Sequence, residues 1–195
     1  RNSTPKRPPS IRPPLGEDQI RQTRQTCKCS KTFKNEFSSF FPQGASLCYL
    51  EKMKNKLKIL FLCTGNSCRS QMAEGWARYL KSEFLQPFSA GLEAHGLNPN
   101  AVKVMQEVGV DISRQKSQHM EDVETVPFDV VVTVCGHADE NCPVFSCATM
   151  VVHHGFDDPP KLAKTAKTEG EALDHYRRVR DEIRAFIETL PEGLY

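Results

Sequence analysis

The sequence lacks any apolar run long enough to cross a membrane. A membrane-spanning helix needs roughly 20 predominantly apolar residues, and every apolar stretch of this chain is interrupted well before that length. The first 52 residues also lack the apolar core of a secretory signal peptide. We therefore expect a cytoplasmic protein that does not contact a membrane.

The chain also lacks a large charge of either sign. It carries 26 Lys and Arg against 24 Asp and Glu, a net charge of +2, so no global field favours nucleic acid as a partner. Residues 1–52 are distinct, because they hold ten basic and four acidic side chains and leave a net charge of −4 to residues 53–195. This first segment is rich in proline and poor in large apolar residues, so we expect a disordered extension.

Met53 is the first methionine and directly precedes the first strand-like sequence. A native start at Met53 is therefore as good a hypothesis as a longer native chain. In either case, we predict that residues 53–195 form the folded domain and that residues 1–52 lie outside it.

Cysteine, in contrast, is abundant for an intracellular chain. The eight cysteines are Cys27, Cys29, Cys48, Cys63, Cys68, Cys135, Cys142 and Cys147. In a small secreted domain this number would indicate a disulfide framework, but without a signal peptide it indicates metal or redox chemistry. The spacing of Cys27, Cys29 and Cys48 is not that of a zinc site, and we predict no metal centre.

Strand-like and helix-like stretches alternate along the rest of the chain. Short apolar runs predict four buried strands, at 57–62, 86–91, 128–135 and 148–154. Apolar residues at helical spacing predict helices that start near Ser70 and span 99–108 and 169–190. This alternation predicts a single α/β domain, in which helices cover both faces of a parallel sheet.

The loop after the first strand, "CTGNSCRS", combines several features of an anion-binding site. It runs from Cys63 to Arg69 as a C-x5-R pattern and ends at a helix N-terminus, whose N–H groups attract anions. Gly65 permits a tight turn, and Arg69 offers a two-pronged cation to a tetrahedral oxyanion. The same field favours the thiolate form of Cys63, to which Ser70 can donate a hydrogen bond.

A thiolate beside a bound oxyanion indicates nucleophilic attack on that anion. The residues that we expect to bind the anion are Thr64, Gly65, Asn66, Ser67, Cys68 and Arg69. Cys68 is either a redox guard that pairs with Cys63 or a small residue that packs in the loop. Cys147 has no evident chemical role.

The stretch "FLCTGNSCRSQMAEG" resembles the active-site loop of the low-molecular-weight protein tyrosine phosphatase fold. Among proteins of this fold, it most resembles the arsenate reductases that are coupled to thioredoxin. The resemblance extends through "SAG" (89–91), "DVVVTVC" (129–135), "GFDDP" (155–159) and "RVRDEI" (178–183). It covers about residues 55–190 and implies the four-stranded parallel sheet of that family.

The resemblance also implies roles for further residues. Asp158 is expected to be the general acid, and Asp157 a turn or cap residue. Cys63 is expected to attack arsenate, after which Cys135 forms a disulfide with Cys63 and arsenite leaves. Cys142 then forms a disulfide with Cys135, which thioredoxin reduces. If residues 136–141 are helical, the last two thiols lie about 10 Å apart and this segment must unwind.

The chain departs from the family pattern at two places. Pro160 stands where the phosphatases carry an aromatic residue, which disfavours a phosphotyrosine substrate. Some relatives bind potassium through residues that correspond to Asn66 and Glu74, but Lys116 and Gln118 replace the other two ligands here. A potassium site is therefore doubtful, no tightly bound cofactor is expected, and we hypothesise that the Lys116 ammonium replaces the cation.

Three functions compete on this evidence. The first is a monomeric arsenate reductase that uses thioredoxin and is inhibited by phosphate and sulfate as competing anions. The second is a phosphomonoesterase that needs Cys63, Arg69 and Asp158 alone. The third is a regulatory protein that binds oxyanion or arsenite without turnover, through Cys27, Cys29 and Cys48.

Overall fold

A computed structural model of the chain describes residues 56–140 and 149–194. The strands are β1 (Leu57–Cys63), β2 (Leu85–Gly91), β3 (Val130–Thr133) and β4 (Met150–His153). The helices are α2 (Arg69–Leu80), α3 (Pro99–Glu107), α4 (Gly136–Glu140), α5 (Pro159–Ala163) and α6 (Glu169–Glu188), with 3-10 turns η2 (Met120–Val123) and η3 (Glu192–Leu194). All four predicted strands and all three predicted helices are confirmed, with bounds that differ by a few residues, whereas α5 was not predicted.

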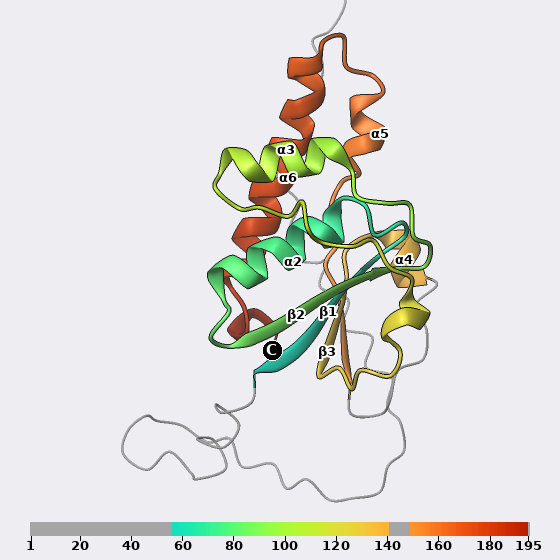
Figure 1. Cartoon of the computed structure of the whole chain (residues 1–195), viewed down its shortest axis with the longest axis vertical. Helices are drawn as coiled ribbons and strands as arrows, with labels where there is room; N and C mark the ends of the chain where they lie inside the picture. Colours follow the sequence, from blue (N-terminus) through green and yellow to red (C-terminus); the bar gives the residue numbers. More distant parts are fainter. Residues whose placement is uncertain (1–55, 141–148, 195) are drawn as a thin grey trace, which may run out of the picture.

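The four strands form one parallel sheet in the order β2-β1-β3-β4 (Figure 1). β1 pairs with β2 on one side and with β3 on the other, and its residues 59–62 have no exposed surface. A strand buried on both faces reads as a continuous apolar run rather than as an alternating pattern. This explains why residues 59–62, "ILFL", are all apolar: they lie at the centre of the core.

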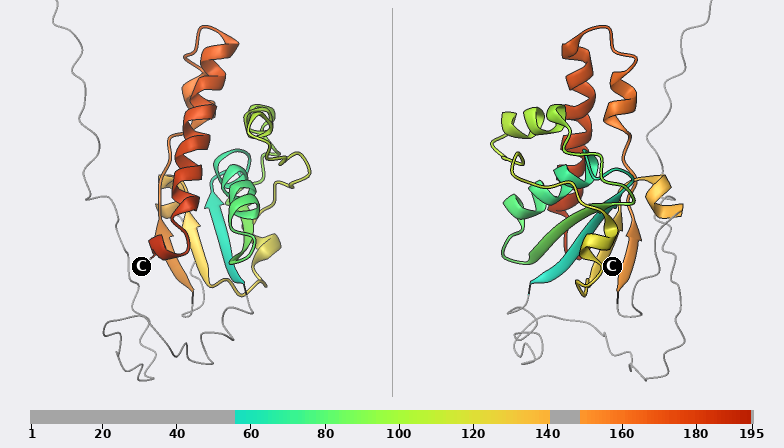
Figure 2. Two further views of the ribbon diagram at one scale, coloured as in Figure 1. Left: turned by 90° about the vertical axis from the view of Figure 1, so that its left-hand side faces the viewer. Right: turned by 45° about the vertical axis from the view of Figure 1, so that its right-hand side comes forward.

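Two long helices build the layer beside β1 and β2. α2 packs on both strands, α6 packs on α2, and α3 and α5 pack on α6; Figure 2 shows α6 as the long red helix. Trp76 of α2 is 1% exposed and its Nε1 donates a hydrogen bond to the Arg180 carbonyl at 3.2 Å. Tyr79, three residues further along α2, is 62% exposed, and its ring meets the Trp76 ring in an edge-to-face contact.

Local signals fix the ends of α3. The Asn98 side chain accepts hydrogen bonds from the N–H groups of Asn100 at 2.9 Å and Ala101 at 3.2 Å, which is the ordinary geometry of an N-cap. Gly109 follows the helix with a φ of 79°, a left-handed conformation that glycine adopts readily. Both features are local sequence signals, and they agree with the helix predicted over residues 99–108.

The carboxyl ends of the strands bring the predicted site residues to one edge of the sheet. Cys63 ends β1 beside Gly91 of β2, and Cys135 follows β3 by two residues. Asp158 follows β4 and immediately precedes α5. In parallel α/β sheets this edge is where ligands bind. Within the described ranges, no helix is long and apolar enough to span a bilayer.

Candidate active site

The loop from Cys63 to Arg69 is held from outside by the segment that follows β2. The carbonyl oxygens of Thr64, Gly65 and Ser67 accept hydrogen bonds from backbone N–H groups of residues 93, 95 and 98, at 2.8, 3.0 and 2.9 Å. The N–H groups of Ser67, Cys68 and Arg69 have no acceptor among the described residues. The carbonyl groups of the loop therefore face the protein, and its N–H groups are available to bind an anion.

Gly65 is required by close packing and not by an unusual backbone angle. A Cβ atom at this position would lie 2.4 Å from Nδ1 of His95. The positive φ in the loop belongs to Asn66, at 43°. The predicted tight turn is present, but its left-handed residue is an asparagine, a type that tolerates this conformation better than most.

The Cys63 sulfur is buried between two hydrogen-bonding groups. The Ser70 Oγ lies 2.9 Å away, and the Asn66 N–H donates to the sulfur at 3.1 Å. The side chain of Cys63 is 3% exposed. The contact between Ser70 and Cys63 is the one that the sequence predicted, and the Asn66 N–H adds a second hydrogen bond to the sulfur.

The Asn66 side chain supports this arrangement from behind. It has no exposed surface, and its Nδ2 donates to Ser70 Oγ at 2.9 Å and to Ser89 Oγ at 3.0 Å. Its Oδ1 accepts hydrogen bonds from Gln71 Nε2 at 2.9 Å and from the Gln118 N–H at 2.8 Å. The side chain of Asn66 therefore holds the loop, and only its backbone faces the sulfur.

Sequence reasoning missed this second layer of residues. Ser89 donates a hydrogen bond to Glu74 Oε2 at 2.6 Å, and Gln71 and Gln118 meet at Asn66. The signal for Ser89 was its position at the end of β2, beside the site. For Gln71 no local signal existed, because its partner Lys116 lies 45 positions further along the chain and only the fold brings the two together.

Arg78 bonds to the Glu74 carboxylate, where the sequence suggested a role for Lys116. The Nε and Nη2 atoms of Arg78 lie 2.9 and 2.6 Å from Glu74 Oε1. Lys116 contributes its backbone carbonyl, which accepts from Gln71 Nε2 at 3.0 Å, and its side chain is exposed. In the part of the chain that the structure describes, no group of three His, Cys, Asp or Glu side chains forms a metal site.

Residues 63–69 are called the anion loop below. Arg69 connects this loop to the candidate acid, Asp158. Its Nη2 lies 3.3 Å from Asp158 Oδ1, and its Nη1 donates to the Phe156 carbonyl at 3.1 Å. Asp158 occupies the N-cap position of α5, yet its side chain makes no capping hydrogen bond and stays 39% exposed. Asp157 is not a cap either, since it forms an ion pair with Arg178 of α6 at 2.8 Å. Only Asp158 therefore points its carboxylate toward the loop.

A second buried thiol lies against the same loop. The Cys135 sulfur is 3.4 Å from Thr64 Oγ1, and the residue is 4% exposed. Cys63, Cys68 and Cys135 are all free thiols. Cys142 falls outside the described residues, as do Cys147 and the three cysteines of the N-terminal segment. The structure thus brings two of the three predicted redox cysteines to one place.

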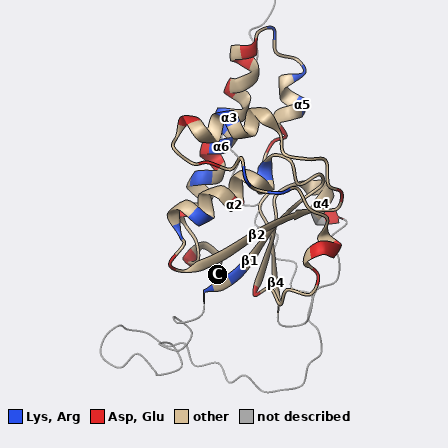
Figure 3. Cartoon of the chain, viewed as in Figure 1, with Lys and Arg blue, Asp and Glu red and all other residues tan. Residues whose placement is uncertain are grey.

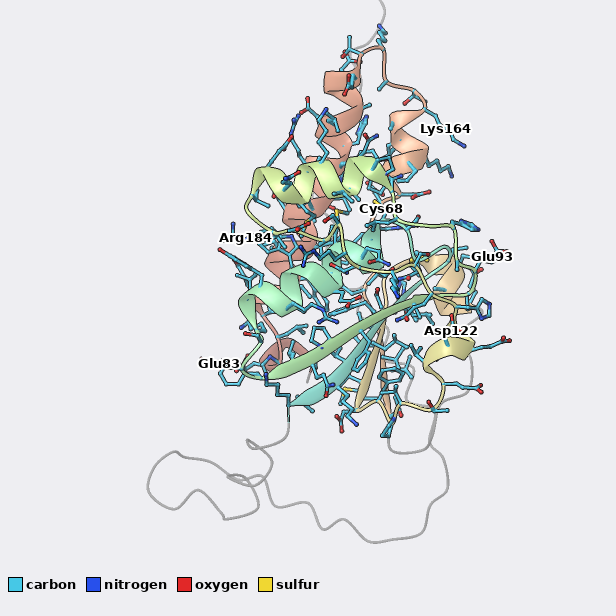
Figure 4. The ribbon with its side chains drawn as sticks, viewed as in Figure 1. Cys68, Glu83, Glu93, Asp122, Lys164 and Arg184 are labelled. Atoms are coloured by element: carbon cyan, nitrogen blue, oxygen red, sulfur yellow. The ribbon has the colours of Figure 1, made fainter. Side chains whose placement is uncertain are left out.

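Cys68 lies at the start of α2 (Figure 4) and is 3% exposed. Burial raises the pKa of the Cys68 thiol well above its usual range, although the nearby Arg69 charge acts in the opposite direction. A protonated thiol is a poor nucleophile. This environment favours the packing role of Cys68 over the redox guard.

Comparisons with known proteins agree with this geometry. The arsenate reductase of Halalkalibacterium halodurans is 51% identical over 138 residues, which cover 71% of this chain and 97% of that protein. The arsenate reductase of Bacillus subtilis is 51% identical over 141 residues, covering 70% of this chain and 99% of that protein.

Solved structures of arsenate reductases and of a related phosphatase resemble this fold. An arsenate reductase in the phosphate binding state has a TM-score of 0.57 at 33% identity and covers 71% of this chain and 99% of its own. The low molecular weight protein tyrosine phosphatase from T. tengcongensis, at 24% identity and a TM-score of 0.55, shares the fold. Over residues 58–194 the sequence matches the low molecular weight phosphotyrosine protein phosphatase family. The chain belongs to this family.

Proposed function

We propose that this protein reduces arsenate to arsenite, with Cys63 as the nucleophile and Cys135 as the second redox cysteine. The observation that carries the proposal is the Cys135 sulfur, 3.4 Å from Thr64 Oγ1 of the anion loop. Phosphoester hydrolysis needs no second thiol beside the nucleophile, whereas reduction of arsenate needs two electrons from a pair of thiols. The two relatives at 51% identity are named arsenate reductases, which supports the same conclusion.

In the first step the Cys63 thiolate attacks the arsenic atom of arsenate. The N–H groups of the loop and the Arg69 guanidinium bind the arsenate oxygens and the charge that develops on them. An S–As bond forms and one As–O bond breaks. Asp158, next to Arg69 at 3.3 Å and partly open to solvent, protonates the oxygen that leaves as water.

In the second step the Cys135 thiolate attacks the Cys63 sulfur. The S–As bond breaks and its electron pair stays on arsenic, so arsenic(V) becomes arsenic(III). The two sulfur atoms are oxidised to a Cys63–Cys135 disulfide, and arsenite leaves. The Cys135 sulfur lies 3.4 Å from the side chain of Thr64, the residue that follows Cys63, which supports this pairing.

Recycling of the nucleophile is assigned to Cys142, which lies outside the described residues. Its thiolate attacks Cys135, forms a Cys135–Cys142 disulfide and frees Cys63 as a thiolate. Residues 136–140 between the two cysteines form helix α4. Because a helix keeps the two thiols too far apart for a disulfide, this segment has to unwind before the bond forms. A dithiol protein such as thioredoxin then reduces the new disulfide.

We propose that the protein works as a monomer, with phosphate and sulfate as competing anions for the loop. The loop together with Asp158 is also sufficient for attack on a phosphoester, so weak phosphomonoesterase activity is compatible with the same site. That activity would need neither Cys135 nor Cys142.

The test is multiple-turnover arsenate reduction with thioredoxin, thioredoxin reductase and NADPH. The parent is compared with Cys135→Ser and Cys142→Ser, and Cys147→Ser is the matched control. We expect sustained NADPH oxidation in the parent and the control, and at most one turnover in Cys142→Ser. Cys135→Ser should form the arsenic adduct and release no arsenite.

Two results would contradict the proposal. One is a parent that shows no arsenate-dependent NADPH oxidation while it cleaves p-nitrophenyl phosphate. The other is full turnover in Cys135→Ser, which would exclude this cysteine from the electron path.

A further inference from the structure

A cavity lies beside α2, apart from the anion loop. Its volume is about 630 Å³, and its walls come from α2, β2, the turn that ends α3, and residues 114–118. Cys63, Arg69, Cys135 and Asp158 are not among its lining residues. The volume is within the range of about 300–1,000 Å³ that is usual for small-molecule sites.

Three basic side chains converge on this cavity: Arg78, Arg114 and Lys116. Figure 3 shows basic positions on α2 and on the segment that crosses it after α3. The Arg78 charge is taken up by Glu74 at 2.6 Å. Within the described parts of the chain, Arg114 and Lys116 form no ion pair with any carboxylate. The cavity therefore offers two cations that no close ion pair holds, although Asp111 lies near enough to Arg114 to interact with its charge.

The acidic residues of the cavity neutralise only part of this positive charge. Both oxygens of Glu74 already accept short hydrogen bonds, from Arg78 and from Ser89 Oγ at 2.6 Å. Asp111 accepts the Ser113 N–H at 2.8 Å and opposes one positive charge. The lining residues, three basic and two acidic, carry a net charge of +1, which favours an anionic occupant.

An aromatic ring is exposed at the same place. Tyr79 is 62% exposed, although large apolar side chains of this domain are mostly buried, and it lines the cavity together with Phe88. Arg114 and Lys116 suit a phosphate or carboxylate group, and the Tyr79 ring suits a flat, partly apolar group. A small organic anion with a planar ring satisfies both.

The cavity is joined to the anion loop through its own walls. Gln115 Nε2 donates to Gln71 Oε1 at 2.9 Å, and Gln71 Nε2 donates to Asn66 Oδ1 at 2.9 Å. Glu74 reaches Asn66 by another route, through Ser89. Both routes end on the residue that holds the Cys63 loop.

We propose that this cavity is an effector site for a small anion that carries a planar ring, such as a nucleoside monophosphate. The occupant binds to Arg114 and Lys116, lies against Tyr79, and changes the mobility of the anion loop through Asn66. The proposal does not depend on the reaction that the loop catalyses.

The first test is calorimetric titration of the full chain with AMP in saturating inorganic phosphate, which fills the anion loop. The parent is compared with Arg114→Gln/Lys116→Gln. The matched control is Lys164→Gln/Lys167→Gln, which removes two charges from the segment that follows α5; Figure 4 labels Lys164 there. We expect one AMP per chain, affinity at least tenfold lower in the first double variant, and control affinity within twofold of the parent. Adenosine should bind more weakly than AMP.

Two results would overturn the site. One is no AMP binding to the parent at millimolar concentration. The other is an equal loss of affinity in both double variants, which would mean that only the overall charge matters.

The coupling between the cavity and the anion loop is measured separately. The measurement is hydrogen exchange of the peptide that contains residues 64–70, at constant phosphate concentration. We expect AMP to change its exchange rate in the parent and not in Arg114→Gln/Lys116→Gln. An unchanged rate in the parent with AMP bound would refute the effector role.

Discussion

At the residue scale, Asn66 serves the site twice. Its N–H donates to the Cys63 sulfur at 3.1 Å, and its side-chain amide holds Ser70 at 2.9 Å. Its φ of 43° is a conformation that costs a residue with a side chain about 1 kcal/mol or more. Its side-chain hydrogen bonds offset that cost, so the strained residue is fixed from within the protein.

Ser70 is the side chain that we expect to matter most for the reactivity of Cys63. Ser70→Ala removes the hydroxyl 2.9 Å from the sulfur, and a hydrogen bond to a charged group contributes about 1.5–3 kcal/mol. The rate of Cys63 alkylation by iodoacetamide at pH 7, followed by peptide mass spectrometry, should fall on the order of tenfold. Ser82→Ala, at an exposed position after α2, is the control and should react like the parent. Equal rates in both variants would show that Ser70 does not stabilise the thiolate.

At the scale of elements, the segment between β4 and α5 is positioned by two arginines. Arg69 of α2 binds the Phe156 carbonyl and Asp158. Arg178 of α6 binds Asp157 at 2.8 Å. The acid is therefore placed by two helices and not by its own short loop.

Arg178→Gln should impair catalysis more than stability. The ion pair with Asp157 is partly exposed, with 45% and 62% of the two side chains accessible, and such pairs contribute about 0–1 kcal/mol to folding. Loss of this restraint should lower kcat about threefold to tenfold with little change in KM, because only the acid moves. Arg184→Gln, which breaks the pair with Glu188 on the same helix, is the control. The role of Arg178 would be rejected if the two variants had the same kcat.

His154 links the end of β4 to α6 and makes this contact sensitive to pH. Its ring stacks on Phe186, with centroids 4.1 Å apart. Burial, together with the neighbouring His153, lowers the pKa of His154 below its usual value of 6.5. As the pH falls below about 6.5, the unfolded chain takes up this proton before the folded chain does, so the folded state loses stability.

His154→Phe keeps the aromatic contact and removes the titrating group. The loss of unfolding free energy between pH 7.5 and 5.5, measured by urea denaturation, should therefore be smaller in this variant than in the parent. His175→Phe, at a lone histidine of α6, should lose as much as the parent. An unchanged pH dependence in His154→Phe would mean that other groups set it.

At the scale of the whole molecule, the described residues form a self-sufficient core. The buried apolar residues run from Ile59 of β1 to Leu194 at the end of η3. No buried polar side-chain atom within the described ranges lacks a hydrogen-bond partner. The family match spans nearly the same residues, 58–194.

The chain truncated to residues 53–195 should consequently keep the fold and the activity. We expect a melting temperature within about 2 °C of the full chain by circular dichroism, because about 1 kcal/mol moves Tm by 2–4 °C at this size. The thioredoxin-coupled rate should also be retained. A drop of more than about 5 °C would show that residues 1–52 are part of the folded unit.

Much of this protein was determined by local sequence alone. Continuous apolar runs gave the parallel strands, because a strand covered on both faces has no polar side. Asn98 and Gly109 fixed the ends of α3, because capping depends on neighbouring residues only. The C-x5-R loop between a strand and a helix predicted Cys63 and Arg69 as candidate site residues for the same reason, since the helix terminus beside them is adjacent in the chain.

What the tertiary structure decided are the contacts between residues far apart in sequence. Gln118 meets Asn66 across 52 residues, Cys135 meets Thr64 across 71, and Arg69 reaches Phe156 across 87. Hydrophobic periodicity states which face of an element is buried, but not which side chain lies opposite. The partner of each polar group is chosen when the strands take the order β2-β1-β3-β4. For that reason the sequence predicted Cys63 as a candidate nucleophile, whereas only the fold paired Arg178 with Asp157 and Gln118 with Asn66.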